Sequence, residues 1–131
     1  MPISISADRQ YPLTASVEIN FDDVTPAGAY AAFDLPSGAV VVGGEIIVDT
    51  AFNSSTNTLS LGDASSATRY ANAVNTQTPA RTALTLTGFK TTGSQPNLIA
   101  TSASTGATPT AGKVRINVSY IVTGRAQEVQ D

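Results

Sequence analysis

The stretch KVRINVSYIV, residues 113–122, decides the fold class of this chain. One set of alternate positions is apolar or aromatic: Val114, Ile116, Val118, Tyr120 and Val122. The set between them begins with Lys113, Arg115, Asn117 and Ser119. Alternation with a period of two predicts a strand with one face buried and one face in water, which is typical of an antiparallel sheet.

The same alternation recurs in shorter stretches along the chain. The sets that we expect to face inward are Val17, Ile19 and Phe21; Ala31, Phe33 and Leu35; Leu59 and Leu61; and Leu84 and Leu86. ATRYANAV (67–74) and NLIATSA (97–103) are weaker candidate strands, and turns rich in proline and glycine separate the stretches. The sequence therefore predicts an all-β fold, an antiparallel jelly-roll-like β-sandwich of eight or nine strands.

The run AVVVGGEIIV, residues 39–48, departs from simple alternation because it is apolar on both sides. Gly43 and Gly44 interrupt it. A strand covered on both faces would explain the pattern. A strand that changes sheets, or one that carries a β-bulge at the two glycines, would explain it equally well.

A chain of 131 residues is expected to form one domain, spanning residues 1–131. Residues 1–11 form a candidate extended N-terminal arm, in which the alternating segment ISIS is too short to be a strand alone, and residues 124–131 form a polar C-terminal tail. The N-terminus lacks the basic and apolar regions of a signal peptide, so we expect synthesis in the cytoplasm.

Composition excludes several classes of function. Only 13% of the residues are charged, the net charge is −3, and Lys and Arg are scattered singly, so no nucleic-acid partner is expected. The chain has no His and no Cys, which removes the commonest general base, thiol chemistry and the usual zinc ligands. No apolar run reaches the length of a membrane span. We predict no enzyme activity, no catalytic residue, no cofactor and no membrane partner.

Four aspartates near predicted strand ends, Asp22, Asp23, Asp49 and Asp63, raise the question of a calcium site. Calcium takes six to eight oxygen ligands, and the sequence has neither a calcium-binding loop motif nor a dense acidic run. Aspartates at such positions commonly accept hydrogen bonds from turn backbone. We therefore predict no metal site.

The stretch LSLGDASSATRY, residues 59–70, is the most specific local pattern. Asp63 can accept hydrogen bonds from the loop backbone that follows it, and the planar guanidinium of Arg69 or of Arg81 can bind the same carboxylate. Tyr70 is expected to place its ring beneath the loop with its hydroxyl toward water. We interpret Asp63, Arg69 and Tyr70 as a structural loop clasp, and a binding site is the alternative.

Residues 36–125 resemble the small β-sandwich proteins of tailed bacteriophage virions. The resemblance lies in LSLGD (59–63), a loop of small residues, RY (69–70), RTALTLTG (81–88) and TPTAGKVRINVSYIV (108–122). It is greatest to the jelly-roll decoration, or cement, proteins of phage capsids. The resemblance implies a non-enzymatic virion protein on the capsid exterior, which bridges major capsid protein subunits non-covalently.

Two hypotheses of function follow. In the first, the protein decorates a capsid and is a homo-oligomer, a dimer or trimer, because a sandwich with few charges has edge strands to cover. Its candidate capsid or oligomer contacts are Ile3, Ile5, Arg9 and Tyr11, and pairing of the arm within its own domain is the alternative. In the second, a tail- or receptor-side module binds carbohydrate or protein through aromatic loop tips, with Phe52, Tyr70 and Phe89 as candidates.

Overall fold

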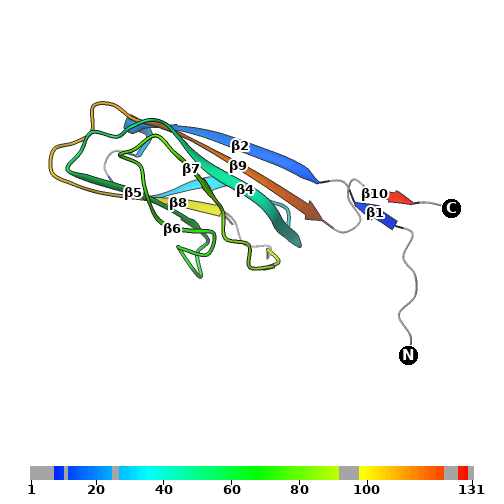
Figure 1. The fold of residues 1–131 in the computed structure, drawn as a ribbon. Helices are drawn as coiled ribbons and strands as arrows, with labels where there is room; N and C mark the ends of the chain where they lie inside the picture. The colour runs from blue at the N-terminus through cyan, green and yellow to red at the C-terminus, as the bar shows by residue number, and fades with distance from the viewer. Residues whose placement is uncertain (1–7, 11, 25–26, 92–97, 123–126, 130–131) are drawn as a thin grey trace.

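The computed structural model describes residues 8–10, 12–24, 27–91, 98–122 and 127–129. Two four-stranded antiparallel sheets pack face to face, and they diverge toward the end of the sandwich near the termini (Figure 1). Within the described residues the helical part is one short 3-10 segment, η1 (Phe21–Val24). The prediction of an all-β antiparallel sandwich is therefore confirmed.

The chain crosses between the sheets repeatedly. The first sheet has the order β2 (Leu13–Asn20), β9 (Lys113–Val122), β4 (Ala39–Thr50) and β7 (Arg81–Ala83). The second has the order β3 (Gly28–Phe33), β8 (Leu98–Thr105), β5 (Thr56–Gly62) and β6 (Ala71–Asn75). Strands β2 and β3 are thus the outer strands on one side of the sandwich, and β7 and β6 are the outer strands on the other.

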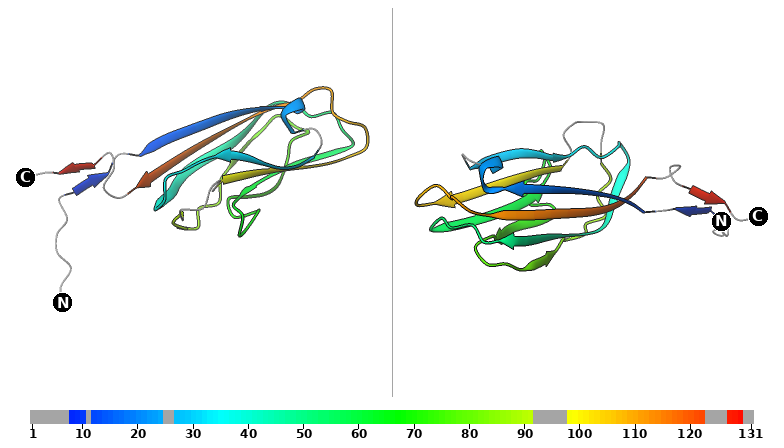
Figure 2. Two further views of the ribbon diagram at one scale, coloured as in Figure 1. Left: turned by 180° about the vertical axis from the view of Figure 1, so that it is seen from behind. Right: turned by 90° about the horizontal axis from the view of Figure 1, so that it is seen from above.

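A separate two-stranded ribbon pairs the two ends of the chain. Strand β1 (Asp8–Gln10) is antiparallel to β10 (Gln127–Val129), and the ribbon lies beyond the end of the sandwich, where β2 begins and β9 ends (Figures 1 and 2). The predicted polar tail, residues 124–131, therefore contains a short strand. Of the predicted arm contacts, Arg9 lies in β1, and Ile3, Ile5 and Tyr11 lie outside the described residues.

The core lies between the sheets, and β9 supplies its centre. Val114, Ile116 and Val118 are each at most 1% exposed, as the alternation in this strand predicts. Opposite them, Leu59 and Leu61 of β5 are also buried. Strand β9 is flanked on both sides, by β2 and by β4, so its buried face contributes to the middle of the core.

Two of the predicted inward sets are partly wrong. Ala31 is exposed, because a bulge between Ala31 and Phe33 shifts the phase of β3 relative to β8. Strand β7 ends at Ala83, so the segment that follows it is not held in the alternating pattern, and Leu86 is 50% exposed. Alternation in the sequence predicts the buried face correctly only along a continuous strand. The prediction fails where a bulge or a strand end interrupts the pleat.

Strand β4 carries a bulge at its glycines and remains in one sheet. Its register with β9 shifts between Val41 and Gly43. Gly44 has a φ of +153°, and a Cβ atom there would lie 2.6 Å from the carbonyl oxygen of Asn117 and 2.6 Å from Cδ1 of Leu84. The bulge interpretation of the two glycines is therefore the one that the structure supports.

Candidate functional site

The loop between β5 and β6 is built around the carboxylate of Asp63. Oδ1 of Asp63 accepts hydrogen bonds from the backbone N–H of Ser65 at 3.0 Å and of Ser66 at 2.8 Å. The N–H of Asp63 donates in turn to the carbonyl oxygen of Ser66 at 2.8 Å. Gly62 precedes this turn because a Cβ atom there would lie 2.1 Å from the same carbonyl oxygen. The small residues of the loop therefore fold tightly against their own strand end.

Arg69 returns to the other oxygen of this carboxylate. Its Nε donates to Oδ2 of Asp63 at 2.6 Å, and its guanidinium lies 3.7 Å from the centroid of the Phe89 ring. Burial raises the pKa of Asp63, but the hydrogen bonds from Arg69 and from the loop backbone outweigh it, so the pKa lies below its ordinary value. The structure thus brings Asp63 and Arg69 together and adds Phe89, which the sequence analysis had treated as a loop-tip aromatic.

Tyr70 lies deeper than expected. The residue is 1% exposed, and among the described residues its buried hydroxyl has no hydrogen-bond partner, so the hydroxyl does not face water. Burial, together with the nearby carboxylate of Asp63, raises the pKa of Tyr70. Its backbone N–H donates to Leu61, and its carbonyl oxygen accepts the N–H of Thr85. Tyr70 therefore joins β5 to the segment that follows β7.

Arg81 does not contact Asp63. Its Nε pairs with Oε1 of Glu45 on the neighbouring strand β4, and Nδ2 of Asn117 donates to the other carboxylate oxygen at 3.2 Å. In the register of β7 on β4, Ala83 lies opposite Glu45 and Arg81 lies opposite Ile47. Arg81 therefore reaches Glu45 diagonally across the two strands. The suggestion of Arg81 as a second partner for Asp63 is therefore wrong.

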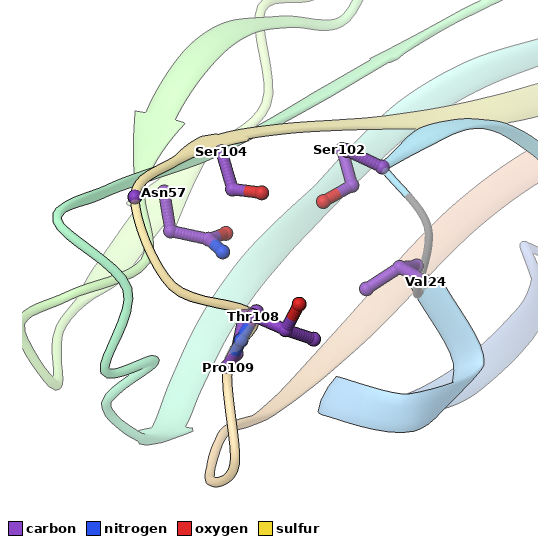
Figure 3. A pocket seen from close by; sticks show the side chains of 8 residues that line it. Val24, Asn57, Ser102, Ser104, Thr108 and Pro109 are labelled. Atoms are coloured by element: carbon purple, nitrogen blue, oxygen red, sulfur yellow. The ribbon is translucent and has the colours of Figure 1, made fainter.

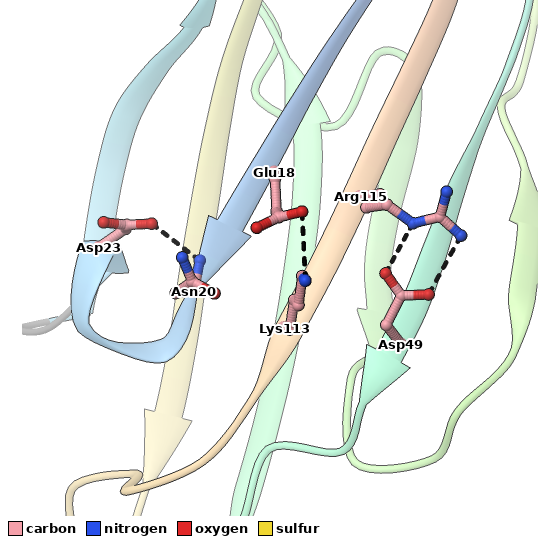
Figure 4. A network of polar contacts seen from close by, with 6 residues as sticks. All are labelled: Glu18, Asn20, Asp23, Asp49, Lys113 and Arg115. Atoms are coloured by element: carbon pink, nitrogen blue, oxygen red, sulfur yellow. Dashed lines mark hydrogen bonds and ion pairs between the residues drawn. The ribbon is translucent and has the colours of Figure 1, made fainter.

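The outer face of the first sheet carries a cross-strand network of charges (Figure 4). Nζ of Lys113 lies 3.3 Å from Oε2 of Glu18, and Arg115 binds Asp49 through two hydrogen bonds of 2.6 and 3.1 Å. Every charged residue of the eight sandwich strands lies in this sheet: Glu18, Glu45, Asp49, Arg81, Lys113 and Arg115. The strands of the second sheet contain no charge, and their outward positions include Ala, Ser, Thr and Asn together with the partly buried Ile99.

Of the four aspartates considered as calcium ligands, Asp22 and Asp23 are adjacent in η1, and Asp49 and Asp63 lie elsewhere with partners of their own. Asp49 pairs with Arg115, Asp63 pairs with Arg69, and Oδ2 of Asp23 accepts the N–H of Asn20 at 2.8 Å (Figure 4). In the part of the chain that the structure describes, no group of three or more His, Cys, Asp or Glu side chains is arranged to hold a metal. The described residues also include no helix of the length and hydropathy that a membrane crossing requires.

A polar hollow of about 150 Å³ lies at the end of the sandwich that is distant from the ribbon. Figure 3 shows Asn57, Ser102, Ser104 and Thr108 pointing their polar groups into it. Asn57 is held at its edge by Nδ2 donating to Ser54 at 3.0 Å and by Oδ1 accepting from Thr76 at 2.7 Å. All of these groups are neutral hydroxyls or amides, so the hollow suits small polar molecules such as water rather than acid–base chemistry.

The aromatic residues proposed as loop-tip contacts are buried or partly covered by other side chains. Phe52 is 3% exposed and packs against Gly112, where a Cβ atom would lie 2.6 Å from its ring. Tyr70 is buried, and Phe89 is half-buried with Arg69 over its ring. Two of the three candidates therefore lie within the packed part of the molecule, and the third is partly covered by Arg69.

No protein-family model matches the chain, and no curated protein matches it in sequence. Several solved structures, including the following two, are similar to it over nearly its full length. One is a chain of the cyanophage Pam1 capsid asymmetric unit, at 28% sequence identity and a TM-score of 0.60, covering 93% of this chain and 91% of that chain. The other comes from the acidic stable capsid structure of Helicobacter pylori bacteriophage KHP30, at 21% identity and a TM-score of 0.66, covering 94% and 99%. The second similarity shows the fold, and the first extends to sequence.

Proposed function

We propose that this protein is a structural protein of a bacteriophage virion. The observation that carries the proposal is the similarity to a chain of the cyanophage Pam1 capsid, at 28% identity over nearly the whole length of both chains. Because the match covers 93% of this chain and 91% of that chain, the similarity is not limited to a short shared fragment. The fold shared with a chain of the phage KHP30 capsid gives further support.

Within the virion, we propose that the protein decorates the exterior of the capsid and cements it by non-covalent bridging of major capsid protein subunits. The protein would be made in the host cytoplasm and added to the shell. Three features support this role: the resemblance of residues 36–125 to decoration proteins, a strand order that we interpret as a jelly roll, and an uncharged outer face on the second sheet. Uncharged, small side chains let two surfaces approach without desolvating ions.

We further propose that the protein acts as a homo-oligomer, a dimer or trimer. Ile3, Ile5, Arg9 and Tyr11 remain the candidate contacts, because Arg9 lies in the ribbon outside the sandwich and the other three are close to it in the sequence. An isolated two-stranded ribbon is marginally stable in water, so packing against another subunit would stabilise it. Asp63, Arg69 and Tyr70 keep the structural role of a loop clasp in this proposal.

The tail- or receptor-side alternative receives less support. It requires exposed aromatic side chains at loop tips, and two of the three candidates, Phe52 and Tyr70, are buried. The third, Phe89, already has a cationic partner in Arg69.

The proposal is tested by adding purified protein to capsids that lack it and measuring co-sedimentation and the temperature at which the shells release DNA. We expect saturable binding to the capsid exterior and a higher release temperature. A variant that lacks residues 1–10 should bind more weakly. Full-length protein that ignores capsids and instead co-purifies with tails would overturn the proposal in favour of the alternative.

A further inference from the structure

The sandwich is open along the seam between β2 and β3. These are the outer strands of the two sheets on the same side, and in the described chain each has a sheet neighbour on one side only. A hollow of about 210 Å³ lies between them. Most of its lining residues are apolar or aromatic: Val17 and Ile19 from β2, Val24 from η1, Tyr30, Ala31 and Ala32 from β3, and Ala100 from β8. The acidic residues Glu18 and Asp23 also line it.

Apolar side chains at this seam are only partly covered. Ala15, Val17 and Ala32 pack against the core and remain half-buried. Their outward neighbours on β2 are polar, with Glu18 directed to Lys113 on the outer face. Strand β2 has a regular register with β9 throughout, and none of its inward residues is charged. A regular edge strand with apolar inward residues can pair with another strand, and its one charge, Glu18, is paired with Lys113.

The segment MPISISA, residues 1–7, has the pattern that fits this edge. Ile3 and Ile5 alternate with Ser4 and Ser6, so an extended strand would direct both isoleucines to one side. The two isoleucines on one face would pack against the apolar side chains of the hollow, and the serines on the other face would be exposed to water.

The position of β1 favours a second copy of the chain as the source of this segment. The described chain begins at Asp8, at the end of the ribbon that is distant from the sandwich (Figures 1 and 2). Nine residues separate Asp8 from Val17, about 30 Å of extended chain. Ile3 is five residues from Asp8 and can reach at most about 18 Å. The arm of one chain therefore starts on the side of its ribbon away from its own hollow, which favours the hollow of a second copy.

We propose that residues 1–7 of a second copy of this chain lie as an added strand along the free edge of β2, with Ile3 and Ile5 in the hollow between β2 and β3. Backbone hydrogen bonds to the edge would supply affinity, and the isoleucines would supply register and specificity. The inference deepens the self-association in the proposed function. It does not depend on a capsid.

Cross-linking between two different variants tests the proposal, because the chain has no cysteine of its own. Ile3→Cys and Ile5→Cys are prepared separately, each with an added affinity tag, and each is mixed with untagged Ala32→Cys. Ser4→Cys is the matched control on the opposite face of the arm. Ala83→Cys is the control for the receiving side, since it is exposed on β7 at the other edge of the sheet. Far-UV circular dichroism checks that every variant is folded.

We expect mild oxidation to give several-fold more mixed dimer from Ile3→Cys or Ile5→Cys with Ala32→Cys than from either control pairing. Equal yields from Ile5→Cys and Ser4→Cys would overturn the proposal, because they would show no preferred face. So would light scattering that finds the full-length chain monomeric at the concentration of the experiment. A chain that cross-links as expected but ignores capsids would refute the capsid-decoration role and leave this contact intact.

Discussion

The carboxylate of Asp63 has more partners than any other acid in the described chain, with two backbone donors and one guanidinium. We predict that Asp63→Ala lowers the free energy of unfolding by about 1–2 kcal/mol, because the loop donors lose their acceptor. Urea denaturation measures the change. Asp22→Ala, at an exposed position of η1, is the control and should cost less than about 0.5 kcal/mol. A thermally silent Asp63→Ala that abolished partner binding would instead identify a binding site.

The same carboxylate should make stability depend on acid. Folding lowers the pKa of Asp63, so its ionised form stabilises the native state at pH values above the ordinary pKa of 3.8. That contribution is lost as the pH falls through the lowered pKa of the folded state. We predict that wild-type protein and Asp63→Asn differ in stability near neutral pH and converge in strong acid. Denaturation curves for both proteins between pH 7 and pH 2 check this, and a difference that stays constant with pH would contradict it.

Tyr70 carries a polar group that the fold does not use. Its hydroxyl is buried without a partner among the described residues, which is unfavourable compared with an apolar group of the same shape. We predict that Tyr70→Phe leaves stability unchanged or raises it by up to about 1 kcal/mol. Because the pKa of Tyr70 is raised by burial, wild-type protein should also lose stability as the pH rises above 10, and the variant should lose less. A loss of 1 kcal/mol or more in Tyr70→Phe would show that the hydroxyl has a partner, such as a bound water.

The conformation of strand β4 requires a glycine at position 44. A Cβ atom on Gly44 would collide with the backbone of β9 and with Leu84, and the φ of +153° disfavours any other residue. We predict that Gly44→Ala costs about 1–3 kcal/mol, measured by thermal or urea unfolding. Gly28→Ala in β3 is the matched control, because nothing lies within 4 Å of its added Cβ atom and no loss beyond about 0.5 kcal/mol is expected. Equal losses in the two variants would remove the bulge from the explanation.

At the scale of the element, the sequence predicts strands better than it predicts contacts between them. The stretch 113–122 became β9 with the predicted inward face, because each alternate position reports the same local pleat. Ala31 was placed on the wrong face because a bulge has no signature in an alanine-rich strand. The contact of Arg69 with Phe89 and the pairing of Arg81 with Glu45 depend on how distant strands are arranged, and no local pattern carries that information.

At the scale of the molecule, the two sheets differ in chemistry. The first has paired charges on its outer face, and the strands of the second contain none. Exposed ion pairs of this kind contribute little to stability, about 0–1 kcal/mol each. Their signs balance, so the outer face of the first sheet is nearly neutral, and in the proposed function we assign it to the side that faces water.

The aspartates of the described residues are not clustered around a common point, and we predict that the stability of the whole fold does not depend on metal. Asp23, Asp49 and Asp63 already accept hydrogen bonds from Asn20, Arg115 and Arg69, so a cation would have to displace protein donors at each. A ligand that binds only the native state must raise its stability, by an amount that grows with ligand concentration. We therefore expect the same melting temperature in EDTA, in calcium and in magnesium, measured by circular dichroism or calorimetry. A rise of several degrees in calcium alone would reveal a site, and repeating the scan with Asp22→Ala and Asp23→Ala would show whether the acidic turn of η1 provides it.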